Sequence, residues 1–142
     1  MASTPHLRFA ARMESMGEIR SYVDRACAEA GLGRDHALRL LLIIEELFTN
    51  SVMHGYGGES DSPVWLSLEA GANAVTLNYQ DEGPAHDPLT SFRPLETTTL
   101  VSQQPVGGLG VKLIRKLAKD ISYRREQNRN CIRVTLSTGG GA

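Results

Sequence analysis

Hydrophobic residues recur at helical spacing in two successive stretches near the start of the chain. In residues 14–30, apolar side chains such as Ile19 and Val23 lie three or four positions apart, and Gly31 follows as a natural helix stop. Residues 34–54 have a leucine- and isoleucine-rich interior and are followed by several glycines. We therefore predict two helices, the second of which should be the central helix of the core.

Short alternating segments predict strands, which pair as two hairpins after a first edge strand. A third helix is predicted at 109–118. The order of elements favours an α+β fold, a two-layer sandwich with helices on one face of a mixed, mostly antiparallel sheet. The predicted strands span residues 7–11, 64–69, 75–79, 121–125 and 131–136.

Composition indicates a single globular domain, assigned to residues 5–137, with a flexible tail at 138–142. The chain has 142 residues, of which 41% are hydrophobic and 22% charged. The net charge of −1 argues against direct binding to nucleic acid. The longest apolar run is too short to span a membrane, and the first residues lack the apolar segment of a signal peptide. Cys27 and Cys131 are expected to be reduced in a cytosol, although a disulfide is possible where geometry allows.

Three motifs carry candidate chemistry, and the first lies on the second predicted helix. Glu46, Asn50 and His54 are four residues apart, so they share one stripe of that helix. The stripe could simply face water, and His54 could simply be a helix-terminal residue near the negative end of the dipole. Burying Glu46 and Asn50 would require polar partners.

The second motif follows the strand predicted at 75–79. An aspartate near a strand end, Asp81, is followed two residues later by Gly83, which lacks a Cβ and lets a flat ligand come close. An ordinary turn has the same pattern.

The third motif is a glycine-rich start to the helix predicted at 109–118. Backbone N–H groups there could converge on an anion, although a flexible join is the alternative. Neither the P-loop nor the dinucleotide-binding pattern fits. The segment comprises Gly107, Gly108, Leu109 and Gly110.

In order and context, the three motifs together resemble the nucleotide-binding boxes of the histidine-kinase-like ATPase superfamily, with its Bergerat ATP-binding fold. Within it, the chain is most similar to the bacterial anti-sigma-factor serine/threonine kinases. The resemblance runs from the first strand through Glu46–Tyr56 and the Asp81 motif to the last strands.

The resemblance implies ATP and Mg²⁺ as cofactors and gives the phosphate side of the site its roles. Glu46 would be the general base, and Asn50 would bind Mg²⁺ together with the phosphates. The segment 89–106 would form a lid over the nucleotide. The phosphate cradle would be Gly107, Gly108, Leu109 and Gly110.

The resemblance also assigns the adenine side. Asp81 would accept a hydrogen bond from the adenine amino group, and Gly83 would let the ring approach. Asn130 stands where the superfamily often has a threonine, and its amide is expected to contribute to nucleotide binding there.

For function, the resemblance implies a cytoplasmic protein serine/threonine kinase that acts as an anti-sigma factor. It would hold a sigma factor inactive, phosphorylate a STAS-domain anti-anti-sigma protein, and form a homodimer. Arg20 on the first helix is a candidate contact for partners, or an ordinary surface arginine. The alternative function is a non-catalytic, ATP-gated protein-binding switch; a simple ATPase ranks last.

Overall fold

Five antiparallel strands form one sheet in the computed structural model, which describes residues 6–87 and 114–138. The strand order is β1-β2-β3-β5-β4, and each of the four described pairings is antiparallel. This confirms the predicted fold class. The elements are β1 Leu7–Ala10, the 3₁₀ turn η1 Met13–Ser15, α1 Met16–Glu29, α2 Arg34–Asn50, the π-helical turn η2 Ser51–Gly55, β2 Pro63–Ala70, β3 Ala74–Asp81, β4 Asp120–Glu126 and β5 Arg129–Ser137.

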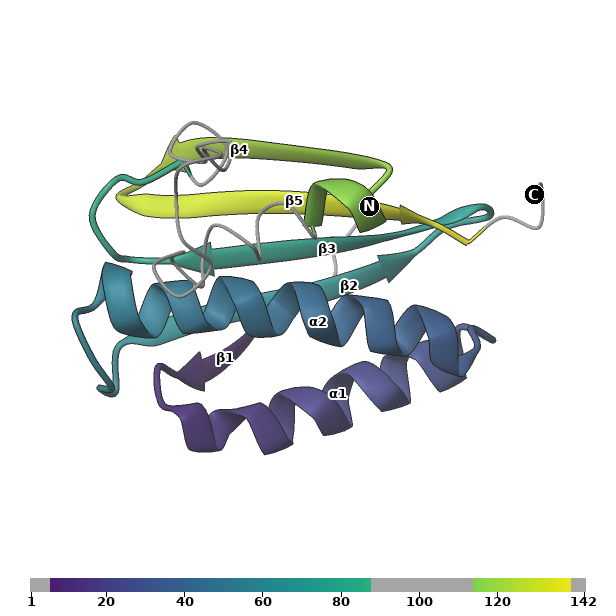
Figure 1. Ribbon diagram of the computed structural model, residues 1–142, viewed down its shortest axis with the longest axis horizontal. Coiled ribbons are helices and arrows are strands. Elements are labelled where there is room, and N and C mark those ends of the chain that lie inside the picture. The colour runs from purple at the N-terminus through teal and green to yellow at the C-terminus, as the bar shows by residue number, and fades with distance from the viewer. Residues whose placement is uncertain (1–5, 88–113, 139–142) are drawn as a thin grey trace, which may run out of the picture.

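Two helices, α1 and α2, lie beside each other along one face of the sheet (Figure 1). The side chains of α2 that face the sheet are fully buried, among them Leu40, Ile44 and Phe48. They pack against alternate residues of the strands, such as Leu77 and Val134, because successive strand side chains point to opposite faces. The leucine- and isoleucine-rich helix is thus the central core helix, as predicted.

Strand β3 is longer than the predicted 75–79, and the extra residues matter for the site. Asp81 is the last residue of β3, where it pairs with Val64 of β2 and Asn130 of β5. Because β2 and β5 flank β3, hydrogen bonds to both extend β3 to its polar last residues. Those residues lack the alternation of hydrophobic side chains on which the sequence prediction relied. Asp81 and Asn130 are therefore cross-strand neighbours.

The helix predicted at 34–54 is not one regular α-helix. The α-helical part ends at Asn50, and Ser51–Gly55 forms a π-helical turn in which the Tyr56 amide donates to the Ser51 carbonyl at 2.8 Å. Such wider turns commonly occur at functional sites. Of the helix predicted at 109–118, residues 114–117 are helical, and those before 114 lie outside the described residues.

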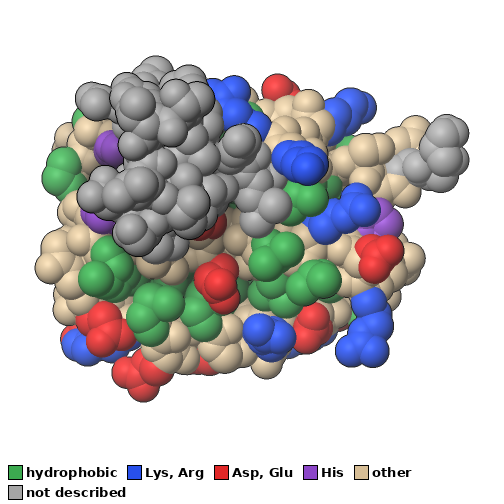
Figure 2. Space-filling view, viewed as in Figure 1, with side chains coloured by type: hydrophobic (Ala, Val, Ile, Leu, Met, Phe, Trp, Pro, Cys, Tyr) green, Lys and Arg blue, Asp and Glu red, His purple; other side chains and the backbone are tan. Residues whose placement is uncertain are grey.

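The surface over the two helices mixes charges of both signs with exposed hydrophobic side chains (Figure 2). Two leucines of α2, Leu38 and Leu42, are exposed. Within the described parts of the chain, no helix has both the length and the apolar character required to cross a membrane. Both cysteines are buried and free of disulfides.

Candidate functional site

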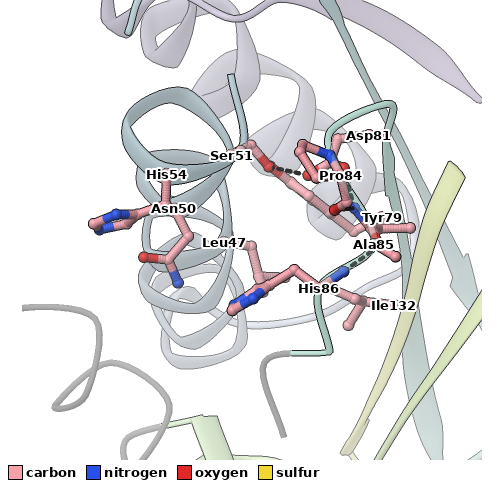
Figure 3. Close-up of a pocket in the computed structure, with 12 residues that line it drawn as sticks. Leu47, Asn50, Ser51, His54, Tyr79, Asp81, Pro84, Ala85, His86 and Ile132 are labelled. Atoms are coloured by element: carbon pink, nitrogen blue, oxygen red, sulfur yellow. Dashed lines mark hydrogen bonds between the residues drawn. The ribbon is translucent and has the colours of Figure 1, made fainter. Parts of the chain in front are cut away.

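A pocket opens between the end of the central helix and the sheet (Figure 3). One side of it is formed by α2 and η2, and the other by β3, β5 and the segment that follows β3. Three of the residues assigned to nucleotide binding, Asn50, Asp81 and Asn130, line it together. The lining residues are Leu47, Asn50, Ser51, His54, Gly55, Tyr79, Asp81, Pro84, Ala85, His86, Asn130 and Ile132.

At one end of the pocket, the Asp81 carboxylate is held through its Oδ2 atom by a chain of hydroxyls. Ser51 Oγ donates to Asp81 Oδ2 at 2.5 Å, and it lies 2.7 Å from the Tyr79 hydroxyl. Since the single Ser51 proton is committed to Asp81, the Tyr79 hydroxyl must be the donor to Ser51. Complete burial raises the pKa of Tyr79 well above its ordinary value, which keeps this donor protonated.

The other carboxylate oxygen, Asp81 Oδ1, is held from β5 and from the following turn. Asn130 Nδ2 donates to it at 2.8 Å and the Gly83 amide at 3.1 Å. Both Asp81 and Asn130 are more than nine-tenths buried. The carboxylate is thus fixed before any ligand arrives.

Gly83 lies against the backbone of Gly55 and is not part of the pocket lining. A Cβ at Gly83 would come within 3.1 Å of the Gly55 Cα. The group that comes close to Gly83 is therefore the backbone of η2. The contact between Gly83 and adenine stays a prediction.

Tyr56 ties the end of η2 to both neighbouring strands. Its hydroxyl donates to the Pro63 carbonyl at 2.6 Å and accepts from the Glu82 amide at 2.7 Å. Burial raises the pKa of Tyr56 to about 12, so the hydroxyl stays protonated and able to donate.

The predicted polar stripe on the helix reaches the other end of the pocket. Asn50 and His54 line the pocket (Figure 3). Glu46 lies one turn earlier and is half-buried, and its Oε2 atom is buried without a hydrogen-bond partner among the described residues. Burial raises the pKa of Glu46, Glu45 adds to the rise, and His54 opposes it. The stripe is therefore not simply a solvated face.

Several predicted site residues lie outside the described residues. These are the lid at 89–106 and the phosphate cradle of Gly107, Gly108, Leu109 and Gly110. In the described ranges, no three His, Cys, Asp or Glu side chains gather as metal ligands.

Ser51 and Tyr79 were missed by the sequence analysis, although both leave a signal. Ser51 is a polar residue four positions after Leu47, on the apolar face of the helix. Tyr79 precedes Asp81 by two positions in a strand, so the two side chains must share a face. A buried carboxylate needs hydrogen-bond donors, and the hydroxyls of Ser51 and Tyr79 could have been considered as such donors.

Comparison with known proteins agrees with this geometry. A family model described as the histidine kinase-like ATPase domain matches residues 9–136. A serine/threonine-protein kinase of Bordetella bronchiseptica is 30% identical over 96 residues, covering 68% of this chain and 67% of the relative. The anti-sigma F factor of Bacillus subtilis is 25% identical over 123 residues, covering 86% of this chain and 83% of the relative.

Solved structures are similar in fold alone. The Acinetobacter baumannii histidine kinase AdeS matches with a TM-score of 0.53 at 15% identity, over 98% of this chain and 70% of that one. The histidine kinase domain of a blue-light-activated kinase of Erythrobacter litoralis matches with a TM-score of 0.50 at 15% identity, over 97% of this chain and 66% of that one. This chain thus spans about two thirds of the length of these histidine kinase chains. With the family model covering nearly all of the sheet and helices, the chain belongs to the histidine kinase-like ATPase domain family.

Proposed function

We propose that this protein is an ATP-dependent protein serine/threonine kinase that acts as an anti-sigma regulator. The observation that carries the proposal is the pocket itself. It has a fixed buried carboxylate, Asp81, at one end, and Asn50 with the half-buried Glu46 nearby at the other. A relative named as a serine/threonine-protein kinase and others named as anti-sigma F factors support it.

The donor set fits a magnesium nucleotide. Mg²⁺ prefers oxygen ligands and is usually held by one or two protein groups plus substrate phosphates and waters. The Asn50 carboxamide lines the pocket, and the Glu46 carboxylate oxygen lacks a partner in the described part of the chain. Asn50 would hold the ion, which when bound supplies charge neutralisation for the phosphates.

In this proposal Asp81 accepts the adenine amino group, and Glu46 removes the proton from the substrate hydroxyl. Phosphoryl transfer depends mostly on positioning and electrostatic stabilisation, which a pocket with a fixed base-binding end can provide. The raised pKa of Glu46 suits a general base, because a carboxylate with a higher pKa accepts a proton more readily.

The proposed partners are a sigma factor, held inactive, and a STAS-domain anti-anti-sigma protein, phosphorylated on serine or threonine. Added phosphate charge would release the STAS protein through repulsion and desolvation at the interface. We further propose a homodimer that works in the cytoplasm, where these partners act. Size-exclusion chromatography with light scattering tests the dimer directly.

Two measurements test the proposed activity. Mg-ATP should raise the melting temperature, because a ligand at a hundredfold excess over its Kd stabilises the fold by about 2.7 kcal/mol, and EDTA should remove most of the rise. Incubation with γ-labelled ATP and STAS proteins from the same genome should then move label onto protein. Label released to water would indicate an ATPase. ATP-dependent partner binding without transfer would indicate a nucleotide-gated switch.

A further inference from the structure

Asn130 has no hydrogen-bonding capacity left for a ligand. Its Nδ2 atom donates to Asp81 Oδ1 at 2.8 Å and to the Pro84 carbonyl at 2.9 Å, with the Gly83 carbonyl also within 3.3 Å. Its Oδ1 atom accepts from the Tyr123 hydroxyl at 2.6 Å and the His86 amide at 3.0 Å. An asparagine side chain has two donor hydrogens and two acceptor lone pairs, and here all four are used.

The orientation of this amide is fixed by its surroundings. The His86 backbone N–H can only donate, so the atom facing it must be the oxygen. The nitrogen side faces a carboxylate oxygen and two carbonyl oxygens, all of them acceptors. A flipped amide could keep only the contact with the Tyr123 hydroxyl, which can also accept, and would lose the others.

Asp81, in turn, has a single acceptor position that no donor of the described residues uses. A carboxylate offers about four lone-pair sites. Asn130 and the Gly83 amide use the two on Oδ1, and Ser51 uses one on Oδ2. One site on Oδ2 remains for a ligand donor.

The number of free acceptor sites on Asp81 determines which base its carboxylate can bind. On its Watson–Crick edge adenine presents one donor hydrogen, from its exocyclic amino group, and this hydrogen needs one acceptor site. Guanine presents adjacent N1–H and N2–H donors, which a carboxylate receives best with one on each oxygen, and its O6 is an acceptor. With Oδ1 filled, Asp81 can satisfy adenine and leaves one guanine donor unpaired in a buried site, which is costly.

We propose that Asn130 is a positioning residue that fills Oδ1 of Asp81 and so makes the pocket select adenine against guanine. It acts through Asp81, because its own amide has no hydrogen-bonding capacity left for the nucleotide. The inference rests on the proposed ATP site and adds the residue that sets its base specificity.

The test compares Asn130→Thr with Asn130→Val in the full chain. Threonine and valine have nearly the same shape and both suit a strand, but only threonine can donate to Oδ1. Dissociation constants for ATP and GTP are measured with Mg²⁺ by titration calorimetry. Thermal unfolding without nucleotide checks that each variant is folded.

The natural protein should bind ATP at least about 100-fold more tightly than GTP. Asn130→Thr should keep this ratio, and Asn130→Val should reduce it at least about tenfold, the equivalent of one buried hydrogen bond. A purely structural role would weaken both nucleotides alike and leave the ratio unchanged. Should the valine variant unfold, Tyr123→Phe removes one of the two donors that hold Asn130, and the ratio should fall in the same direction.

An unchanged ratio in a folded valine variant would overturn the inference, as would equal binding of ATP and GTP by the natural protein. In both cases ATP would still bind, so the proposed function would stand. Binding of neither nucleotide by the natural protein would instead overturn the ATP site itself, and the inference with it.

Discussion

The two ends of the pocket are built in opposite ways. At the sheet end, Asp81 is buried and receives three hydrogen bonds from the protein itself. One helical turn before Asn50 at the helix end, outside the pocket lining, the Glu46 carboxylate is half-buried and one of its oxygens has no hydrogen-bond partner among the described residues. The fold therefore supplies most of the partners of the carboxylate that we propose to bind the base. In the described part of the chain it leaves one Glu46 oxygen, near the end proposed for phosphate chemistry, without a partner.

The difference predicts that the two ends have separate roles in binding and in catalysis. A fixed carboxylate binds a base without reorganisation, so the sheet end should set affinity and specificity. A carboxylate with a raised pKa, one of whose oxygens has no partner in the described ranges, is suited to proton transfer, so Glu46 should set the rate. Perturbing each end separately should therefore produce separate effects.

The largest effect is expected from Glu46→Gln. Phosphate transfer to a STAS partner should fall about 10²–10⁴-fold, the range typical of a lost general base, while ATP affinity stays nearly constant. The measurement is single-turnover transfer beside calorimetric binding. An exposed glutamate at the end of α1 provides the control, because Glu29→Gln should transfer at the natural rate. Natural-rate transfer by Glu46→Gln would show that Glu46 is not the base.

Asp81→Asn should act on binding first. The amide would bring its own NH₂ group toward donors that now point at a carboxylate, leaving pairings unmet at about 1–3 kcal/mol each. ATP should bind about 10–100-fold more weakly. The exposed Glu82→Gln variant is the control and should bind as the natural protein does. A variant that bound ATP normally but transferred slowly would reverse the roles assigned to the two ends.

Gly83→Ala tests whether backbone packing holds the sheet end in place. The added Cβ would meet three backbone atoms of Gly55 at 3.1–3.3 Å, and backbone cannot swing aside as a side chain can. We expect a loss of about 1–3 kcal/mol in the free energy of unfolding, measured by urea denaturation. Gly17 is the matched control: its Cβ would meet no atom within 4 Å, so Gly17→Ala in α1 should stabilise by up to about 1 kcal/mol. Equal behaviour of the two variants would remove the packing argument.

The smallest effect concerns pH and the helix end. Because the folded state raises the pKa of Glu46, it binds that proton more strongly than the unfolded state does. The free energy of unfolding should therefore decline as pH rises from the ordinary glutamate pKa through the raised one. The free energy of unfolding of Glu46→Gln should not show this decline with pH. Parallel stability curves for the two proteins in urea denaturation between pH 4 and 7 would contradict the raised pKa.

The sequence was most informative where one periodicity dominates. The two long helices, the edge strand and both hairpins follow from hydrophobic spacing, because burial of one face decides each of them. The final hairpin is closed by Gln127 and Asn128, both at positive φ, in the two-residue turn that suits right-twisted strands. The fold class was predictable for the same reason.

The site was only partly predictable, because its geometry depends on contacts between distant segments. Asp81 was identified from a motif and Asn130 from the family resemblance, but their pairing across β3 and β5 depends on strand register. The π-helical turn at 51–55 has no periodic signal in the sequence, and its first residue, Ser51, donates a tertiary hydrogen bond to Asp81. Motif spacing can identify the residues of a site, whereas the hydrogen-bond directions that we propose to set specificity require coordinates.

The Tyr56 hydroxyl has a consequence for motion in the folded protein. It joins the end of η2 to β2 and to the segment after β3 through a single oxygen. The Glu82 amide, just beyond the strand and on an exposed residue, is therefore protected from solvent exchange only while that hydroxyl is in place. Its hydrogen–deuterium exchange rate would report how often this corner of the pocket opens, independently of global unfolding.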